Sequence, residues 1–386
     1  MKILFFIGTV YPYGSAWSSR GRNLAKLFKL LGYEVHIISH STNEVGYTIG
    51  QTTNFDGIPY ESLFTKVTRL NRFYGSIVDI EAIKRYVKSN EIDVFITSNI
   101  PQIYKPLRAF LKRKKIPIII EQCEWFDPLT FKMRNFDPYY RSLMKRIRND
   151  YHKSDGIIAI STLLEEYYAN KGARVVRIPT ILDTESIDYR NKIKAKNKQL
   201  KLVFAGSIGG KKELLRPIFE AIDNVRNEIN IEFNIYGPDE KEVLSNINND
   251  KELLSRISND VRIHGRIPQQ QIYDKLREAD FMVFFRPNRR SSNAGFPTKF
   301  AESLAVGTPV ITNNTSDLGM YLSHGKNGFI VNELNVSSIV NIIEEISLLS
   351  YEDIDNLRNN ARLTAEEHFD YRNYKNDIKI LLEPLI

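Results

Sequence analysis

Short apolar runs rich in β-branched residues alternate with longer segments of helical periodicity, and this alternation most constrains the fold. It is typical of βαβ units, in which a crossover helix follows each strand of a parallel sheet. A polar, Lys/Asn-rich stretch at residues 181–199 separates two such series. We therefore predict an α/β protein with two Rossmann-like parallel-sheet domains. The predicted strands are 3–7, 35–39, 94–97, 116–120, 156–160 and 175–178 in the first series, and 202–206, 233–236, 261–264, 281–285, 310–312 and 329–331 in the second.

The length of 386 residues also favours two domains, each large enough to bury its own core. We place them at residues 1–182 and 183–369. The last segment contains an amphipathic stretch at 374–382, and we expect residues 370–386 to pack back on the first domain. Because ligands bind at the carboxyl ends of parallel strands, two facing sheets predict one cleft between the domains.

The composition is that of a soluble globular protein, with 42% apolar and 26% charged residues. Cys123 is the only cysteine, which excludes an internal disulfide. The apolar run at 3–7 meets Gly8 and predicts a strand rather than a signal peptide, and no run reaches the roughly 20 apolar residues of a membrane-spanning helix. We expect a cytoplasmic protein.

The net charge of +8 is concentrated in the first half. Residues 1–182 carry 27 Lys and Arg against 16 Asp and Glu, whereas the remaining residues carry 27 against 30. Such a basic half attracts an anionic membrane surface, an acidic polymer or a nucleic acid, or it only keeps the protein soluble. No nucleic-acid recognition motif accompanies the charge, so we expect no nucleic-acid partner.

Residues 294–311 contain the most informative motif. A tight Gly-Phe-Pro loop at 295–297 precedes a helix that begins near Thr298, ends at Gly307 and leads into a buried strand. The start of a helix offers unpaired backbone N–H groups and a positive dipole end, which suit a diphosphate. Glu302, one turn inside the helix, can direct its carboxylate at a ribose diol.

This stretch resembles the signature of the group 1 retaining glycosyltransferases of the GT-B fold, in which Glu, seven residues and a second Glu precede Ala-x-Gly-x-Pro-Val-Ile. Glu302 falls on the second Glu, which these enzymes use for the nucleotide ribose. Ala294 replaces the first, which orients hydroxyls of the donor sugar. The resemblance implies donor contacts by Gly295, Phe296, Pro297, Thr298, Lys299 and Glu302.

Residues 202–212 are similar to another element of that family, a strand followed by Gly-Arg, a short loop and Lys. Gly206 matches the glycine, and Lys212 stands where the family places a lysine on the diphosphate. Ser207 replaces the arginine. Three arginines just before the Gly-Phe-Pro loop are substitutes for it, or else solvated loop charges: Arg286, Arg289 and Arg290.

Weaker correspondences extend the resemblance over nearly the whole chain. Gly237 follows the strand 233–236, and Arg266 and Ile267 lie in the loop whose backbone contacts the base in the family. In the first half, Gly14 and Ser15 match the glycine-rich loop near the diphosphate and acceptor. Residues 154–161 resemble the last βα unit of the acceptor domain.

Glu124 follows the strand 116–120, where many relatives carry a histidine facing the anomeric carbon. Beside Trp125 and Phe126, its carboxylate would stabilise a developing cationic sugar or contact acceptor hydroxyls. Alternatively, Glu124 caps a loop and Trp125 packs in the core.

Basic and apolar residues interleave from 131 to 153, and one helical face carries Tyr140, Leu143, Met144, Ile147 and Tyr151. A basic amphipathic helix of this kind suits docking on an anionic bilayer that holds a lipid-linked acceptor. The alternative is that this face belongs to the core.

The resemblance implies transfer of a hexosyl group with retention from a nucleotide diphosphate sugar, with UDP favoured. The acceptor would be a glycan or lipid-linked oligosaccharide of a surface or capsular polysaccharide. We expect Lys212, Arg286 and Glu124 to carry the chemistry by positioning and charge stabilisation, without cofactor or metal. The pair Asp353 and Asp355 lies in a helical segment and is discounted as a metal site. Alternatives are a nucleotide-sugar epimerase or phosphorylase on the same fold, and a non-catalytic nucleotide-sugar-binding or scaffold subunit.

Overall fold

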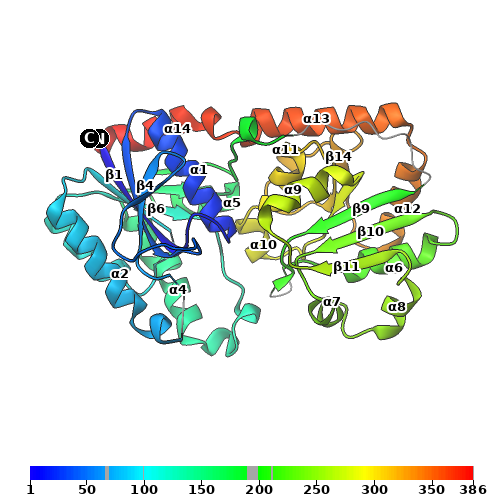
Figure 1. Cartoon of the computed structure of the whole chain (residues 1–386), viewed down its shortest axis with the longest axis horizontal. Coiled ribbons are helices and arrows are strands. Elements are labelled where there is room, and N and C mark those ends of the chain that lie inside the picture. Colours follow the sequence, from blue (N-terminus) through cyan, green and yellow to red (C-terminus); the bar gives the residue numbers. More distant parts are fainter. Residues whose placement is uncertain (66–68, 99, 189–198, 210–211, 386) are drawn as a thin grey trace. The chain divides into compact units, whose positions relative to one another are not determined.

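The computed structural model describes residues 1–65, 69–98, 100–188, 199–209 and 212–385. The chain divides into two compact units, shown in Figure 1. Unit 1 comprises Met1–Leu182 and Asp370–Ile386, and unit 2 comprises Asp183–Phe369. Most of the polar stretch between the two strand series, together with Gly210 and Lys211, lies outside the described residues.

Unit 1 is built on an eight-stranded sheet of order β3-β4-β2-β1-β5-β6-β7-β8. All neighbouring strands are parallel except β3 and β4, which form an antiparallel pair at one edge. The strands are β1 (Lys2–Val10), β2 (Glu34–Ser41), β3 (Thr53–Phe55), β4 (Ile58–Ser62), β5 (Val94–Thr97), β6 (Ile118–Gln122), β7 (Gly156–Ala159) and β8 (Val175–Arg177). The helices between them are α1 (Ala16–Leu30), α2 (Arg69–Ser89), α3 (Tyr104–Arg113), α4 (Pro138–Asn149) and α5 (Thr162–Ala169).

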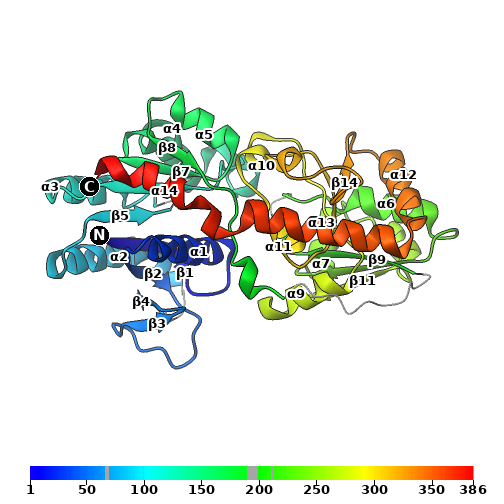
Figure 2. The same ribbon diagram turned by 90° about the horizontal axis from the view of Figure 1, so that it is seen from above.

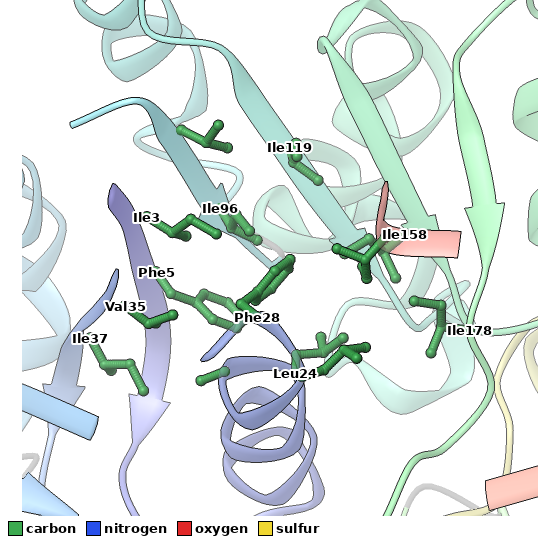
Figure 3. Packing of buried hydrophobic residues seen from close by; sticks show 14 of the residues in the cluster. Ile3, Phe5, Leu24, Phe28, Val35, Ile37, Ile96, Ile119, Ile158 and Ile178 are labelled. Carbon is green, nitrogen blue, oxygen red and sulfur yellow. The ribbon is translucent and has the colours of Figure 1, made fainter. Parts of the chain in front are cut away.

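Helix α1 supplies the centre of the unit 1 core. Its Leu24 and Phe28 are fully buried and belong to the same apolar cluster as Phe5 of β1 and Ile158 of β7, as Figure 3 shows. The helix begins at Ser15, whose Oγ accepts a hydrogen bond of 3.0 Å from the backbone N–H of Ser18. The glycine turn between β1 and this helix is thus fixed by a capping interaction.

The last helix, α14 (Lys375–Leu382), belongs to unit 1 (Figure 2). Its buried face contributes Ile378, Leu381 and Leu382 to the core of that unit. Gly156, at the start of β7, leaves the space that Leu381 occupies, because a Cβ there would approach Leu381 Cδ1 to 2.9 Å.

Unit 2 has a six-stranded, fully parallel sheet of order β11-β10-β9-β12-β13-β14. The strands are β9 (Leu200–Ala205), β10 (Ile231–Tyr236), β11 (Val261–Gly265), β12 (Phe281–Val283), β13 (Val310–Asn313) and β14 (Gly328–Val331). The helices are α6 (Arg216–Val225), α7 (Glu240–Asn246), α8 (Lys251–Arg256), α9 (Gln269–Glu278), α10 (Arg290–Ala294), α11 (Thr298–Ala305), α12 (Val336–Ser347) and α13 (Tyr351–Phe369).

The predicted α/β fold class is confirmed, because both sheets are formed mostly by parallel strands that alternate with helices. Among the described residues, no helix has both the length and the apolar character needed to cross a bilayer.

Candidate active site

The carboxyl ends of β9 and β10 meet at two glycines in unit 2. Gly206 follows β9 with φ at 139°, and Gly237 follows β10 with φ at 116°. The N–H of Gly206 donates to the carbonyl of Tyr236 at 3.0 Å. A Cβ at Gly237 would collide with the carbonyl oxygen of Gly206, and a Cβ at Gly206 would lie 3.1 Å from Lys299 Cε and Nζ. Only glycines therefore allow the two turns and the lysine to pack this closely.

Lys299, in the first turn of α11, directs its side chain into this edge of the sheet. Its side chain is 13% exposed, and its Nζ lies 3.2 Å from Glu213 Oε1 and 4.1 Å from the ring centroid of Phe204. The Nζ atom is shielded from solvent and makes no hydrogen bond within the described residues. Burial lowers the pKa of Lys299, and the nearby Glu213 carboxylate opposes that shift.

Arg286 is a second buried cation close to Glu213, and it is 6% exposed. Its Nε lies 3.8 Å from Glu213 Oε1, and its Nη1 donates to the carbonyl of Ser292 at 3.2 Å. The side chain of Asn313, at the end of β13, forms hydrogen bonds with both the N–H and the carbonyl of Arg286. Asn313 Oδ1 accepts from the Arg286 N–H at 2.9 Å, and its Nδ2 donates to the Arg286 carbonyl at 2.8 Å.

Lys299, Arg286 and Glu213 form what we call the charge cluster. The cluster holds two cations and one carboxylate, and its three side chains are 13%, 8% and 6% exposed. The Glu302 carboxylate also acts on Lys299. Two cations at so buried a site would attract an anion that arrives at this edge of the sheet.

The loop before α11 leads into the helix whose first turn carries Lys299. Pro297 precedes the first turn, and a proline side chain has no acceptor for the free N–H groups there. The ring of Phe296 packs in an aromatic group, with its centroid 5.7 Å from that of Tyr321 and 5.6 Å from that of Phe369. The loop is thus anchored by its phenylalanine, and the helix start is left without a side-chain cap. Glu302, one turn further, is half-buried.

In unit 1, a buried ion pair lies under the carboxyl end of β6. Arg20 of α1 pairs with Glu121, and its Nη2 donates to the carbonyl of Ile178 at 2.8 Å. Cys123 donates its thiol to the same Glu121 carboxylate, and burial raises the pKa of Cys123 far above its usual range. This network ties α1 to the strand ends near the predicted acceptor residues.

Glu124 is half-buried next to this network, and its carbonyl accepts from Gln122 Nε2 at 2.6 Å. Trp125 is buried, 5.1 Å from Tyr167 between ring centroids, with the Arg148 guanidinium 5.7 Å from its ring. The tryptophan therefore packs as a core residue.

Two sequence families match this chain in succession. Residues 185–364 match "Glycosyl transferases group 1", and residues 21–186 match "Glycosyltransferase Family 4". The chain is a group 1 glycosyltransferase. It belongs to the retaining family 4 enzymes, which use nucleotide-sugar donors.

Solved structures share the GT-B fold of this glycosyltransferase at low identity. Sucrose-phosphate synthase from Thermosynechococcus elongatus is 14% identical with a TM-score of 0.74, covering 100% of this chain and 98% of its own. HepE from Anabaena, in complex with UDP and glucose, is 15% identical with a TM-score of 0.66 and 99% coverage of both chains. WaaG, a glycosyltransferase of lipopolysaccharide biosynthesis, is 14% identical with a TM-score of 0.67, covering 98% and 99%. No curated protein sequence matches the chain.

The structure of the glycosyltransferase brings some of the predicted donor residues together. Gly206, Gly237, Arg286 and Lys299 meet at one edge of the unit 2 sheet. The predicted diphosphate lysine, Lys212, has an exposed side chain, whereas the adjacent Glu213 is buried.

The other predicted residues in this half of the glycosyltransferase are mostly exposed. Ser207 is exposed, and its Oγ accepts from the Gly209 N–H at 3.1 Å. Arg266 has an 85% exposed side chain, and Ile267 beside it is half-buried. Arg289 and Arg290 are exposed at the start of α10, and Ala294 at its end is fully buried.

Sequence reasoning missed Glu213 and Asn313. Glu213 follows the sequence Gly209-Gly210-Lys211-Lys212, which is typical of a loop, so nothing in the sequence marks it as buried. Asn313 had a usable signal, because it directly follows the predicted buried strand 310–312, and a polar residue there lies at the ligand edge of a parallel sheet.

Proposed function

We propose that this glycosyltransferase moves a hexosyl group from a UDP-sugar, bound by unit 2, to a hydroxyl of a glycan or lipid-linked oligosaccharide. UDP is favoured because structures of HepE, which shares the fold, hold UDP, glucose and UDP-glucose. The transfer retains the anomeric configuration, as expected for the family, and uses no metal or other cofactor.

The observation that carries the proposal is the charge cluster. Its two cations lie in a setting where water screens their charge poorly. A donor diphosphate would interact favourably with both cations and accept a hydrogen bond from Lys299 Nζ. We assign the diphosphate to Lys299 and Arg286, with Glu213 holding both cations in place while the site is empty.

The start of α11 supplies the second part of the donor site. The N–H groups of its first turn and the positive end of the helix dipole would face a second phosphate oxygen. Glu302 lies on the next turn and would bind the ribose hydroxyls. Gly206 and Gly237 would let the backbone approach the nucleotide closely, with Ile267 and the backbone near Arg266 reading the base.

The transfer itself needs no enzymic nucleophile. The bond between the anomeric carbon and the diphosphate oxygen breaks, and a bond to the acceptor oxygen forms on the same face. The acceptor's proton passes to the departing diphosphate oxygen, so UDP and the glycoside are the products. The charge cluster would stabilise the negative charge that develops on the leaving group.

Unit 1 would hold the acceptor. We assign acceptor contacts to Glu124 and to the Gly14-Ser15 turn, and Lys212 to a surface contact with the donor phosphates. The Arg20–Glu121 pair would position these strand ends rather than touch the substrate. We further propose a role in surface or capsular polysaccharide synthesis, in the cytoplasm and at the inner face of the membrane.

A panel of nucleotide sugars and glycan acceptors tests the proposal. The expected result is UDP release with one donor, and an NMR spectrum of the product that shows the donor's anomeric configuration. Lys299→Met should abolish turnover, and Lys251→Met, a change of an exposed lysine on α8, should not. Nucleotide-sugar binding without turnover on any acceptor would favour a scaffold subunit instead.

A further inference from the structure

The apolar face predicted for docking on a membrane is part of the core. The five residues of this face are each 8% exposed or less: Tyr140, Leu143, Met144, Ile147 and Tyr151. Any contact of this region with a partner must use other side chains.

A different apolar surface lies just before this helix. Leu129, in the short helix η1 (Pro128–Thr130), is 49% exposed, and Tyr139, at the start of α4, is 48% exposed. Between them, Met133 is 58% exposed and Phe136, in the short helix η2 (Arg134–Phe136), is 77% exposed. We call residues 128–139 the apolar knob.

The knob is a folded element of unit 1. Helix η2 packs against both η1 and α4, which brings the exposed side chains into one neighbourhood. The ring of Phe131 packs the knob against the rest of unit 1. Its centroid lies 6.2 Å from that of Phe126 and 5.2 Å from that of Tyr140. Figure 1 shows α4 toward the lower edge of unit 1. Large apolar side chains gathered at a surface in this way indicate a contact site.

The charges around the knob are positive. Lys132, Arg134, Arg141 and Lys145 are exposed, and none of them has an ion pair within the described residues. The only carboxylates between residues 127 and 145 cap helices: Asp127 accepts from the Leu129 N–H at 2.9 Å, and Asp137 accepts from the Tyr139 N–H at 3.0 Å. The half-buried Glu124 carboxylate also acts on Tyr139. The exposed charged side chains of the knob itself are cationic.

We propose that the apolar knob docks this glycosyltransferase on an anionic phospholipid surface. Met133 and Phe136 would enter the boundary between headgroups and acyl chains, flanked by Leu129 and Tyr139. The four cations would contact lipid phosphates. Exposed apolar side chains close to cationic ones in the chain match an anionic bilayer, which offers both environments within a few ångströms.

This inference rests on the proposed function, because it names the residues that would carry the membrane location proposed there. The test uses vesicles without donor or acceptor, so its failure would leave the transfer reaction untouched. The full chain is sedimented with vesicles of phosphatidylglycerol and phosphatidylethanolamine, and with vesicles of phosphatidylcholine alone. We expect binding to the first at low salt, weaker binding at high salt, and little binding to the second.

Two double variants separate the apolar and charged contributions. Met133→Ser with Phe136→Ser should reduce the vesicle partition coefficient by about tenfold. The matched control is Leu363→Ser with Ile380→Ser, because these side chains are 59% and 63% exposed elsewhere. It should bind as the unaltered protein does.

Lys132→Glu with Arg134→Glu should also weaken binding about tenfold or more and flatten its salt dependence. Its control is Lys241→Glu with Lys251→Glu, at exposed positions of unit 2. Calorimetric UDP affinity should be the same for all four double variants, which shows that each is folded.

Three results would overturn the proposal. One is the absence of binding to anionic vesicles at low salt. Another is binding that the Met133→Ser, Phe136→Ser variant leaves unchanged. The third is a dimer in sedimentation velocity that this variant dissociates while vesicle binding is absent, which would assign the knob to a second copy of the chain.

Discussion

Lys299 Nζ lies 3.2 Å from Glu213 Oε1, and neither Nζ nor the other carboxylate oxygen of Glu213 makes a hydrogen bond within the described residues. Both groups are nearly inaccessible to water. Burying charges with unmet hydrogen-bonding capacity costs stability, and such costs concentrate where a ligand later meets them. We interpret this pair, with Arg286, as a diphosphate site held ready by an internal counter-ion.

Glu213→Gln should destabilise the ligand-free protein. Removing the carboxylate takes away the nearest counter-charge of two buried cations, at a cost of about 3 kcal/mol. Since UDP would then relieve a larger repulsion, the rise in Tm on adding UDP should exceed that of the unaltered protein. Thermal unfolding with and without UDP measures both effects. Glu344→Gln, an exposed change on α12, is the control, and equal UDP-induced shifts in the two variants would contradict the role given to Glu213.

Donor affinity should begin to fall at a lower pH than it would if Lys299 had the pKa of an ordinary lysine. Burial lowers the pKa of Lys299 below its ordinary value of 10.5, with Glu213 opposing the shift. The folded chain thus releases this proton before the unfolded chain does. The cost of the buried ammonium is fully present at neutral pH, and it is relieved as pH rises from the lowered folded pKa toward 10.5.

Over the same window, the loss of charge should weaken UDP-glucose binding. Lys299→Arg retains its charge there, so its profile of Kd against pH should be flatter. Because the uracil ring also loses a proton at high pH, the ratio of the two Kd values is compared. A ratio that stays constant across the window would exclude titration of Lys299 as the cause.

Asn313→Ala should loosen Arg286. It removes two hydrogen bonds, of 2.9 and 2.8 Å, and leaves a backbone N–H and carbonyl of Arg286 buried without them. Each such group costs about 1–3 kcal/mol, so we expect a lower Tm and weaker UDP binding. The neighbouring Asn314→Ala loses one exposed hydrogen bond of 3.2 Å and should have little effect. Equal losses of Tm and UDP affinity in both variants would show that the hydrogen bonds from Asn313 to Arg286 do not matter for donor binding.

Arg20→Met should destabilise unit 1 without changing the donor site. The substitution leaves the Glu121 carboxylate buried without its cation, which costs about 3–5 kcal/mol. Denaturant unfolding measures the loss, with Arg113→Met, an exposed change on α3, as control. UDP affinity below the unfolding transition should be unchanged. A large change in UDP affinity would instead assign Arg20 a part in donor binding.

The parallel sheets were predictable because their strands are short, apolar and buried, as 202–205 and 310–313 illustrate. The antiparallel pair β3 and β4 was missed. Its strands are three and five residues long, and β4 contains Pro59 and alternates buried with half-buried positions at the sheet edge. So short and polar a pattern does not differ from a loop in the sequence.

The candidate site was predictable only in outline. The loop at 295–297 and the start of α11 follow from turn chemistry and helix signals. Which lysine is buried does not follow, because only tertiary packing, including the space that Gly206 leaves for Lys299, determines it. The Glu213 side chain is buried and the Lys212 side chain is exposed. Likewise, an apolar stripe on α4 could face core or membrane, and only tertiary packing distinguishes them.

Calorimetric titration of UDP into the Lys299→Met variant tests the central claim most directly. Methionine keeps the length and apolar contacts of the lysine stem, so the fold should remain at least as stable. We predict that Kd rises about a hundredfold, from the loss of a charge-assisted contact in a buried site, while Lys251→Met binds normally. An unchanged UDP affinity in folded Lys299→Met protein would contradict the charge cluster as the donor's phosphate site.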